Sequence, residues 1–130
     1  MCDNVPNLAK KPLGFVTPED ATLQFAEFRR PKGHIIAPHV HNPVKRSIVG
    51  TQEVLICVAG IIDLDVYASS GEHVETVRLY HGDVAILLSG AHSLTMVAES
   101  VFLEVKQGPY VGSADKTYLP GSRLGPPNLG

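Results

Sequence analysis

The stretch Gln52–Val58 reads QEVLICV, and after Ala59 and Gly60 the chain continues over Ile61–Ala68 as IIDLDVYA. Both runs are short and rich in Val, Ile and Leu, which is typical of β-strands. Gly60 marks a turn between them, because glycine adopts backbone angles that other residues avoid. These residues therefore predict two successive strands.

The same pattern of short apolar runs extends from Thr22 to Gln107. Eight strands are expected, at Thr22–Arg29, His34–Val40, Gln52–Val58, Ile61–Ala68, Val74–Tyr80, Val84–Leu88, His92–Ala98 and Val101–Gln107. Turn signals separate them at short, regular spacing, which indicates an all-β sandwich or barrel. We expect an irregular N-terminal arm over residues 1–20, a β-barrel over 21–107, and a tail over 108–130 whose prolines and glycines deny it regular structure. That tail is either disordered or a strap packed on the barrel.

Composition excludes several classes of protein. The chain has 130 residues, 44% of them hydrophobic and 18% charged, as in one globular domain. A net charge of −2 lacks the basic excess of a nucleic-acid-binding protein. The longest apolar run, Val54–Ile62, is too short for a bilayer-spanning helix, and no secretory signal is visible. Two cysteines form no disulfide framework, so we expect a cytoplasmic protein without membrane partners.

Histidines are frequent, six in all, and three of them stand where strands could bring them together. His39 and His41 are separated by one residue, so strand alternation puts both imidazoles on one face. Glu53 and His92 each stand at the start of an expected strand, on a mainly apolar face. Imidazole and carboxylate ligands suit Fe, Mn, Ni, Cu or Zn. Each residue alone also fits a surface role, and only their conjunction favours a metal site.

Two segments resemble the motifs of the cupin family. The first is Gly33-x5-His39-x-His41 followed by Glu53-x6-Gly60, and the second is Gly82-Asp83-x6-Gly90-x-His92. The resemblance covers about residues 22–107 and implies a double-stranded β-helix, or jelly-roll barrel, that carries a metal inside it. It implies His39, His41, Glu53 and His92 as ligands of one divalent transition metal.

The sequence also departs from the cupin pattern. Eleven residues, Asn42 to Gln52, separate His41 from Glu53, where three or four are usual. Leu88 stands where the second motif usually has proline, and Met96 replaces an asparagine that often follows the histidine. The longer loop leaves two roles open for Glu53: a metal ligand, or a group that supports three histidine ligands.

Further residues could line the pocket. Glu104 and Lys106 share a strand face with Phe102, and the pair faces either the interior or solvent. Tyr110, just beyond the barrel, either closes its mouth or serves as a hydrophobic strap residue. Lys45 and Arg46 offer a cationic rim for an anionic substrate, or an ordinary surface pair. Glu53, Lys106 and Tyr110 are thus the candidate catalytic residues.

Three functions fit this sequence. The leading one is a metal-dependent enzyme, an oxygenase, isomerase or decarboxylase, acting on a small metabolite that is anionic or sugar-derived. The alternatives are a metal-free isomerase or epimerase of sugar nucleotides that uses a barrel histidine as base, and a module that binds a small ligand without turnover. The segment from Phe102 to Tyr110 loosely resembles small cupins of the WbuC type. Family analogy suggests a homodimer, which Leu23, Phe25 and Phe28 could serve.

Overall fold

The computed structural model describes residues 14–120, so the beginning of the expected arm and the end of the expected tail lie outside the described residues. The chain divides into two compact units, Met1–Ile48 and Val49–Gly130, which are described separately below. The described part of the chain contains no helix with the length and apolar character needed to cross a membrane.

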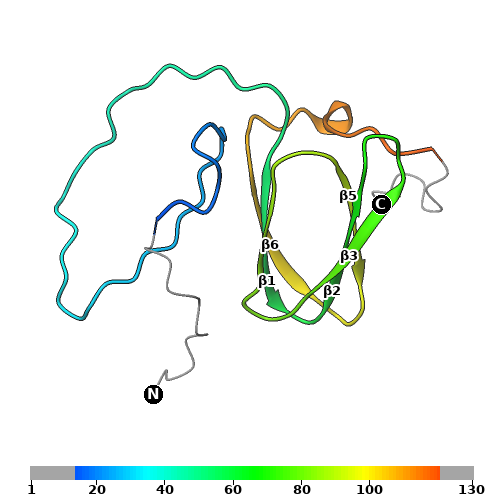
Figure 1. Cartoon of the computed structure of the whole chain (residues 1–130), viewed down its shortest axis with the longest axis horizontal. Helices are drawn as coiled ribbons and strands as arrows, with labels where there is room; N and C mark the ends of the chain where they lie inside the picture. Colours follow the sequence, from blue (N-terminus) through cyan, green and yellow to red (C-terminus); the bar gives the residue numbers. More distant parts are fainter. Residues whose placement is uncertain (1–13, 121–130) are drawn as a thin grey trace. The chain divides into compact units, whose positions relative to one another are not determined.

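The second unit is built from strands, as Figure 1 shows. The elements are β1 (Glu53–Ala59), β2 (Ile62–Tyr67), β3 (His73–Leu79), β4 (Val84–Leu87), β5 (Ala91–Met96), β6 (Val101–Lys106) and the short 3₁₀ helix η1 (Gly112–Asp115). They form two antiparallel three-stranded sheets, ordered β4-β1-β6 and β3-β2-β5. The all-β class is therefore confirmed, with six strands over the described residues.

Gly60 takes the chain from one sheet to the other, because β1 and β2 belong to different sheets. Its φ is +83°, a left-handed conformation that side chains disfavour. A Cβ at this position would collide with the Glu99 carbonyl oxygen and the Ser100 hydroxyl. Ser100 Oγ accepts a hydrogen bond from Ile61 N at 3.2 Å, so the crossing is packed against the turn before β6. This turn requires glycine for both its conformation and its space.

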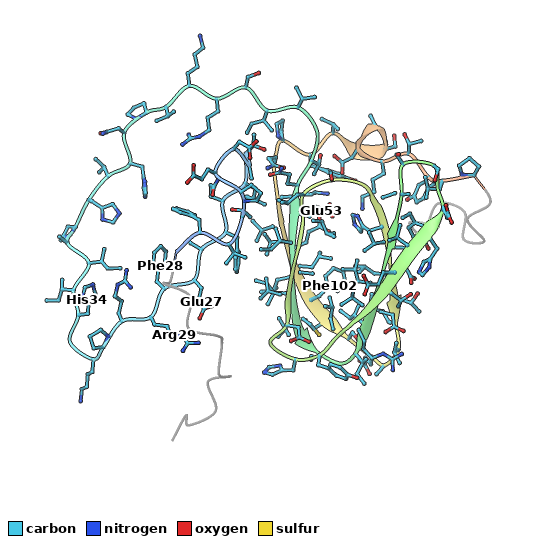
Figure 2. All side chains as sticks on the ribbon, in the orientation of Figure 1. Glu27, Phe28, Arg29, His34, Glu53 and Phe102 are labelled. Carbon is cyan, nitrogen blue, oxygen red and sulfur yellow. The ribbon has the colours of Figure 1, made fainter. Side chains whose placement is uncertain are left out.

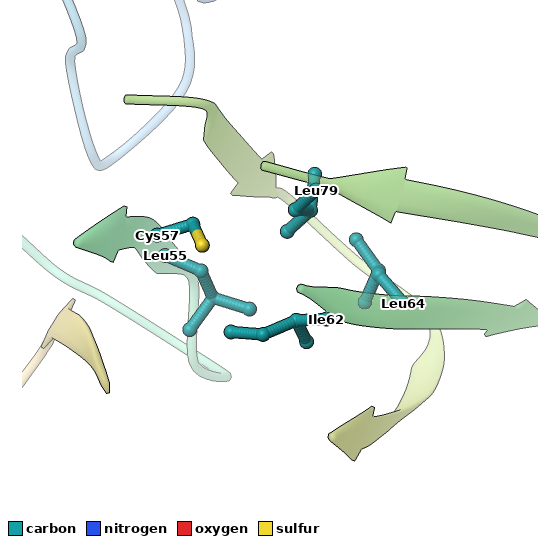
Figure 3. Close-up of a cluster of buried hydrophobic side chains, with 5 residues drawn as sticks. All are labelled: Leu55, Cys57, Ile62, Leu64 and Leu79. Carbon is teal, nitrogen blue, oxygen red and sulfur yellow. The ribbon is translucent and has the colours of Figure 1, made fainter. Parts of the chain in front are cut away.

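The hydrophobic core lies between the two sheets. Leu55 and Cys57 of β1 pack with Ile62 and Leu64 of β2 and Leu79 of β3, as Figure 3 shows. Each of these side chains is at least 95% buried. Burying a leucine or isoleucine side chain contributes about 1.5–3 kcal/mol. Strand alternation thus directs every second residue of β1 and β2 into one shared core.

The outer face of the sheet β3-β2-β5 is polar. Arg78 donates two hydrogen bonds to Asp63, at 2.7 and 2.9 Å. Asp65 accepts a hydrogen bond from the Thr76 hydroxyl, and His73 Nε2 lies 3.1 Å from the same carboxylate. The Arg78 hydrogen bonds lower the pKa of Asp63, and the Thr76 hydrogen bond is the main cause that lowers the pKa of Asp65. This sheet therefore presents a solvated face of cross-strand pairs.

The described part of the first unit holds a small turn and continues as extended chain. Phe15 and Ala26 form an isolated antiparallel bridge, and Thr17 Oγ1 donates to Gln24 Oε1 at 3.0 Å across it. Residues 28–48 contain no strand and are almost entirely exposed. The expected strands Thr22–Arg29 and His34–Val40 do not form here, beyond that single bridge. Alternation alone cannot make a strand, because a strand needs a neighbour for its backbone hydrogen bonds.

Candidate functional site

A carboxylate and an imidazole meet between the two sheets of the second unit. Glu53 opens β1 and has the same strand parity as Leu55 and Cys57, so its side chain points inward and is 6% exposed. Figure 2 shows Glu53 near one end of the space between the sheets. His92 reaches the same point from β5, and its Nε2 lies 3.0 Å from Glu53 Oε2. The pair thus joins the two sheets across the interior.

The contact between Glu53 and His92 is close but lacks the alignment of a hydrogen bond. Glu53 Oε2 is buried and has no hydrogen-bond donor among the described residues. A buried carboxylate oxygen without a donor loses its hydration and gains nothing in exchange. A hydrogen-bond donor or a bound cation would satisfy this atom.

Lys106, at the end of β6, is held by three carboxylates. Its Nζ lies 3.1 Å from Asp115 Oδ2, 3.2 Å from Glu104 Oε1 and 4.0 Å from Glu53 Oε1. The register pairs Lys106 with Glu53 and Glu104 with Leu55, so Glu104 and Lys106 are on the inward face. Hydrogen bonds to Asp115 and Glu104 raise the pKa of Lys106, which keeps its ammonium charged. This ammonium is committed to internal carboxylates and is not a free anion-binding group.

Two residues beyond β6 complete this end of the unit. The Tyr110 ring lies with its centroid 5.5 Å from Lys106 Nζ, within reach of a cation–π contact, while the side chain stays largely exposed. Asp115 comes from η1, so its contact with Lys106 ties the described part of the tail to β6. The sequence pattern predicts Glu53, Lys106 and Tyr110 as site residues but not Asp115, since a lone aspartate in an irregular segment carries no pattern.

His39 and His41 belong to the first unit, in exposed extended chain. Their rings are in edge-to-face contact with centroids 5.2 Å apart, and His39 Nδ1 lies 2.8 Å from the Ala37 carbonyl oxygen. The two imidazoles thus lie side by side, as their spacing predicts. The structure brings Glu53 together with His92, and it brings His39 together with His41.

The described residues offer part of a metal site. Over residues 14–120, no group of three or more His, Cys, Asp or Glu side chains is arranged to hold an ion. Glu53 and His92 nevertheless fit two positions of a site, because a nitrogen and an unpartnered carboxylate oxygen converge. Comparison with family models, curated proteins and solved structures finds no match to this chain, so its own geometry carries the functional argument.

Proposed function

We propose that this chain is a cupin-type metalloprotein that binds a divalent transition metal between its sheets and acts on a small metabolite. The unpartnered, buried Oε2 of Glu53 beside His92 Nε2 is the observation that carries this proposal. A divalent cation held by both side chains would satisfy the carboxylate and use the imidazole lone pair. The cupin-like motifs of the sequence support the same assignment.

The proposed ligand set is Glu53 and His92 of the second unit with His39 and His41 of the first. Each unit by itself holds one adjacent pair: a carboxylate beside an imidazole in the second, and two imidazoles in edge contact in the first. His39 and His41 enter the proposed set only because the cupin-like motifs of the sequence imply them. When bound, the ion would supply a Lewis acid or a redox centre to a small substrate, and positions not filled by side chains would accept water or substrate.

Charge around the site favours a cation. Glu53, Glu104 and Asp115 outnumber the single ammonium of Lys106. Lys106 would hold Glu104 and Asp115 apart from the ion. A substrate anion would then be attracted by the metal and not by Lys106.

Metal titration tests this proposal directly. The full chain would be freed of metal with chelator and titrated with Zn²⁺ by calorimetry and with Co²⁺ by visible absorption, which reports nitrogen and oxygen ligands. We expect one ion per chain, with affinity lowered at least about tenfold in Glu53→Gln and in His92→Gln. Adding His39→Gln and His41→Gln separately tests the two ligands from the first unit.

His73→Gln is the matched control. His73 also stands about 3 Å from a carboxylate, Asp65, but on the outer face and with Thr76 as a further hydrogen-bond partner. Its replacement should leave metal binding unchanged. Equal affinity in the wild type, Glu53→Gln and His92→Gln would refute the site. Wild type that binds no ion but turns over sugar nucleotides would favour a metal-free base, His92 oriented by Glu53.

A further inference from the structure

A lysine and a glutamate that are direct cross-strand neighbours do not form a close pair. The register of β1 and β6 places Lys106 opposite Glu53. Side chains at such positions are near enough for opposite charges to pair. Lys106 Nζ nevertheless lies 4.0 Å from Glu53 Oε1, and no described residue donates a hydrogen bond to Glu53 Oε2. Another interaction therefore holds this ammonium back from the carboxylate opposite it.

Asp115 is the partner that holds the Lys106 ammonium. Its Oδ2 accepts a hydrogen bond from Lys106 Nζ at 3.1 Å, and Glu104 Oε1 lies 3.2 Å from the same nitrogen. The Asp115 side chain is 14% exposed and that of Glu104 is 32% exposed, so water screens the Asp115 contact less. Asp115 belongs to η1, whereas Glu104 lies on β6 beside Lys106. A residue from beyond the last strand thus supplies the better shielded contact.

Glu53 is the acceptor to which Lys106 would turn if the Asp115 carboxylate were lost. An ammonium has three donor hydrogens on a flexible four-carbon stem, and Glu104 alone would leave part of that capacity unused. Glu53 is directly opposite and has an oxygen without a donor. A movement of roughly 1 Å would bring the two groups to the distance of a charge-assisted hydrogen bond. We therefore expect Lys106 to pair with Glu53 when Asp115 loses its charge.

We infer that Asp115 is a positioning residue of the proposed metal site: it keeps Lys106 away from Glu53, so that this carboxylate stays free to bind a cation. The inference rests on the proposed function and adds a residue that acts through Lys106. An ammonium bound to Glu53 would occupy an oxygen that the ion needs. It would also place a positive charge beside the ion and repel it.

Two simpler roles for Asp115 would also weaken metal binding when the carboxylate is removed. Asp115 could serve only to tie η1 to β6, or its charge could serve only to attract the ion. Neither role by itself changes how strongly Glu53 and Lys106 interact in the metal-free chain. The strength of that interaction therefore distinguishes a positioning role from the other two.

A double-mutant cycle on the metal-free full chain measures this interaction. Glu53→Gln, Lys106→Met and their combination would be unfolded with urea in the wild type and again in Asp115→Asn, which removes the charge and keeps the shape. We expect the coupling between Glu53 and Lys106, taken as a ratio of unfolding constants, to be roughly two- to tenfold larger in Asp115→Asn. Lys106→Gln serves as the second variant if Lys106→Met does not unfold cooperatively. Equal coupling in both backgrounds overturns the inference.

Titration with Co²⁺ measures the effect of Asp115 on the site itself. Asp115→Asn should bind the ion about 10–100-fold more weakly than the wild type, as loss of a residue behind a metal ligand commonly does. Asp63→Asn is the matched control and should bind as the wild type does, because it removes a carboxylate that pairs with a cation, Arg78, on the outer face of the other sheet. If the wild type and Asp115→Asn bind the ion equally well, the inference fails and the proposed function stands. A wild type that binds no ion overturns both.

Discussion

At the scale of single residues, Glu53 shows what a sequence can and cannot locate. Its parity with Leu55 and Cys57 predicts an inward side chain, and the structure finds it 6% exposed. Its neighbours could not be predicted equally well, because the contact with His92 joins strands from different sheets. Spacing along one strand fixes direction, whereas distance across the interior depends on how the sheets pack.

Lys106 offers a prediction at this scale. Replacing it with methionine keeps most of the apolar stem but leaves Glu53, Glu104 and Asp115 without their shared cation. We expect Lys106→Met to lose about 1–3 kcal/mol in free energy of unfolding at pH 7, measured with urea. Lys106→Arg keeps the charge and should lose less.

The difference in unfolding free energy between the wild type and Lys106→Met should change with pH in a definite direction. The pKa of Lys106 is raised in the folded chain, so its stabilisation is complete below the ordinary value of 10.5 and is lost as pH rises through the raised value. The deficit of Lys106→Met relative to the wild type should therefore shrink at high pH. If Lys106→Met is less stable than the wild type by the same unfolding free energy at pH 7 and above the raised pKa, Lys106 does not act as the shared cation.

At the scale of elements, the sequence pattern correctly predicts those strands that pair with another strand in the structure. The six runs from Gln52 to Gln107 each overlap an observed strand, with bounds that differ by at most two residues. The two runs before Gly50 have similar alternation, yet lack a ladder partner in the structure. Local pattern determines which residues can form a strand, while pairing is decided by distant residues. The crossing at Gly60 was likewise predicted as a turn, but not as a change of sheet.

Two glycines allow a matched test of that crossing. Gly60 and Gly71 have similar φ values, +83° and +87°, but a Cβ would collide only at Gly60 and meets nothing within 4 Å at Gly71. Gly71→Ala should cost about 1 kcal/mol in unfolding free energy for backbone conformation alone, and Gly60→Ala about 3 kcal/mol for conformation plus collision. Urea midpoints measure both. Equal losses of unfolding free energy in the two variants would show that the Glu99–Ser100 turn can move aside at no cost in stability.

The polar face of β3-β2-β5 predicts acid sensitivity. The pKa of Asp65 is lowered mainly by the Thr76 hydrogen bond, so its ionised form stabilises the fold above the ordinary value of 3.8. This stabilisation should be lost as pH falls below 3.8 and through the lowered pKa. In Asp65→Asn the stability between neutral pH and pH 2–3 should fall less steeply than in the wild type, as followed by thermal unfolding. Identical slopes would show that other carboxylates control the acid transition.

At the scale of the whole molecule, hydrophobic burial is unequal between the two units. All the buried hydrophobic residues of the described chain lie in the second unit, from Val54 to Leu79. The first unit buries Thr17, while Phe28, Ile35 and Val40 remain exposed. A segment without buried apolar side chains has nothing to offset the entropy of ordering its backbone. Stability of the chain is therefore expected to reside in the strands after Val49.

Because the buried hydrophobic residues lie in the second unit, one fragment can test whether that unit is stable by itself. Residues 49–130 should fold alone, with a β-type circular dichroism spectrum and a cooperative urea transition, while a peptide of residues 1–48 should not. The fragment keeps Glu53 and His92 but lacks His39 and His41. If all four residues bind the ion, its Co²⁺ affinity should fall at least about tenfold, and its Co²⁺ spectrum should change because two nitrogen ligands are gone. A folded fragment with undiminished affinity and the same spectrum would confine the site to the second unit. Loss of folding would instead show that the first unit contributes to the core, which contradicts the burial pattern.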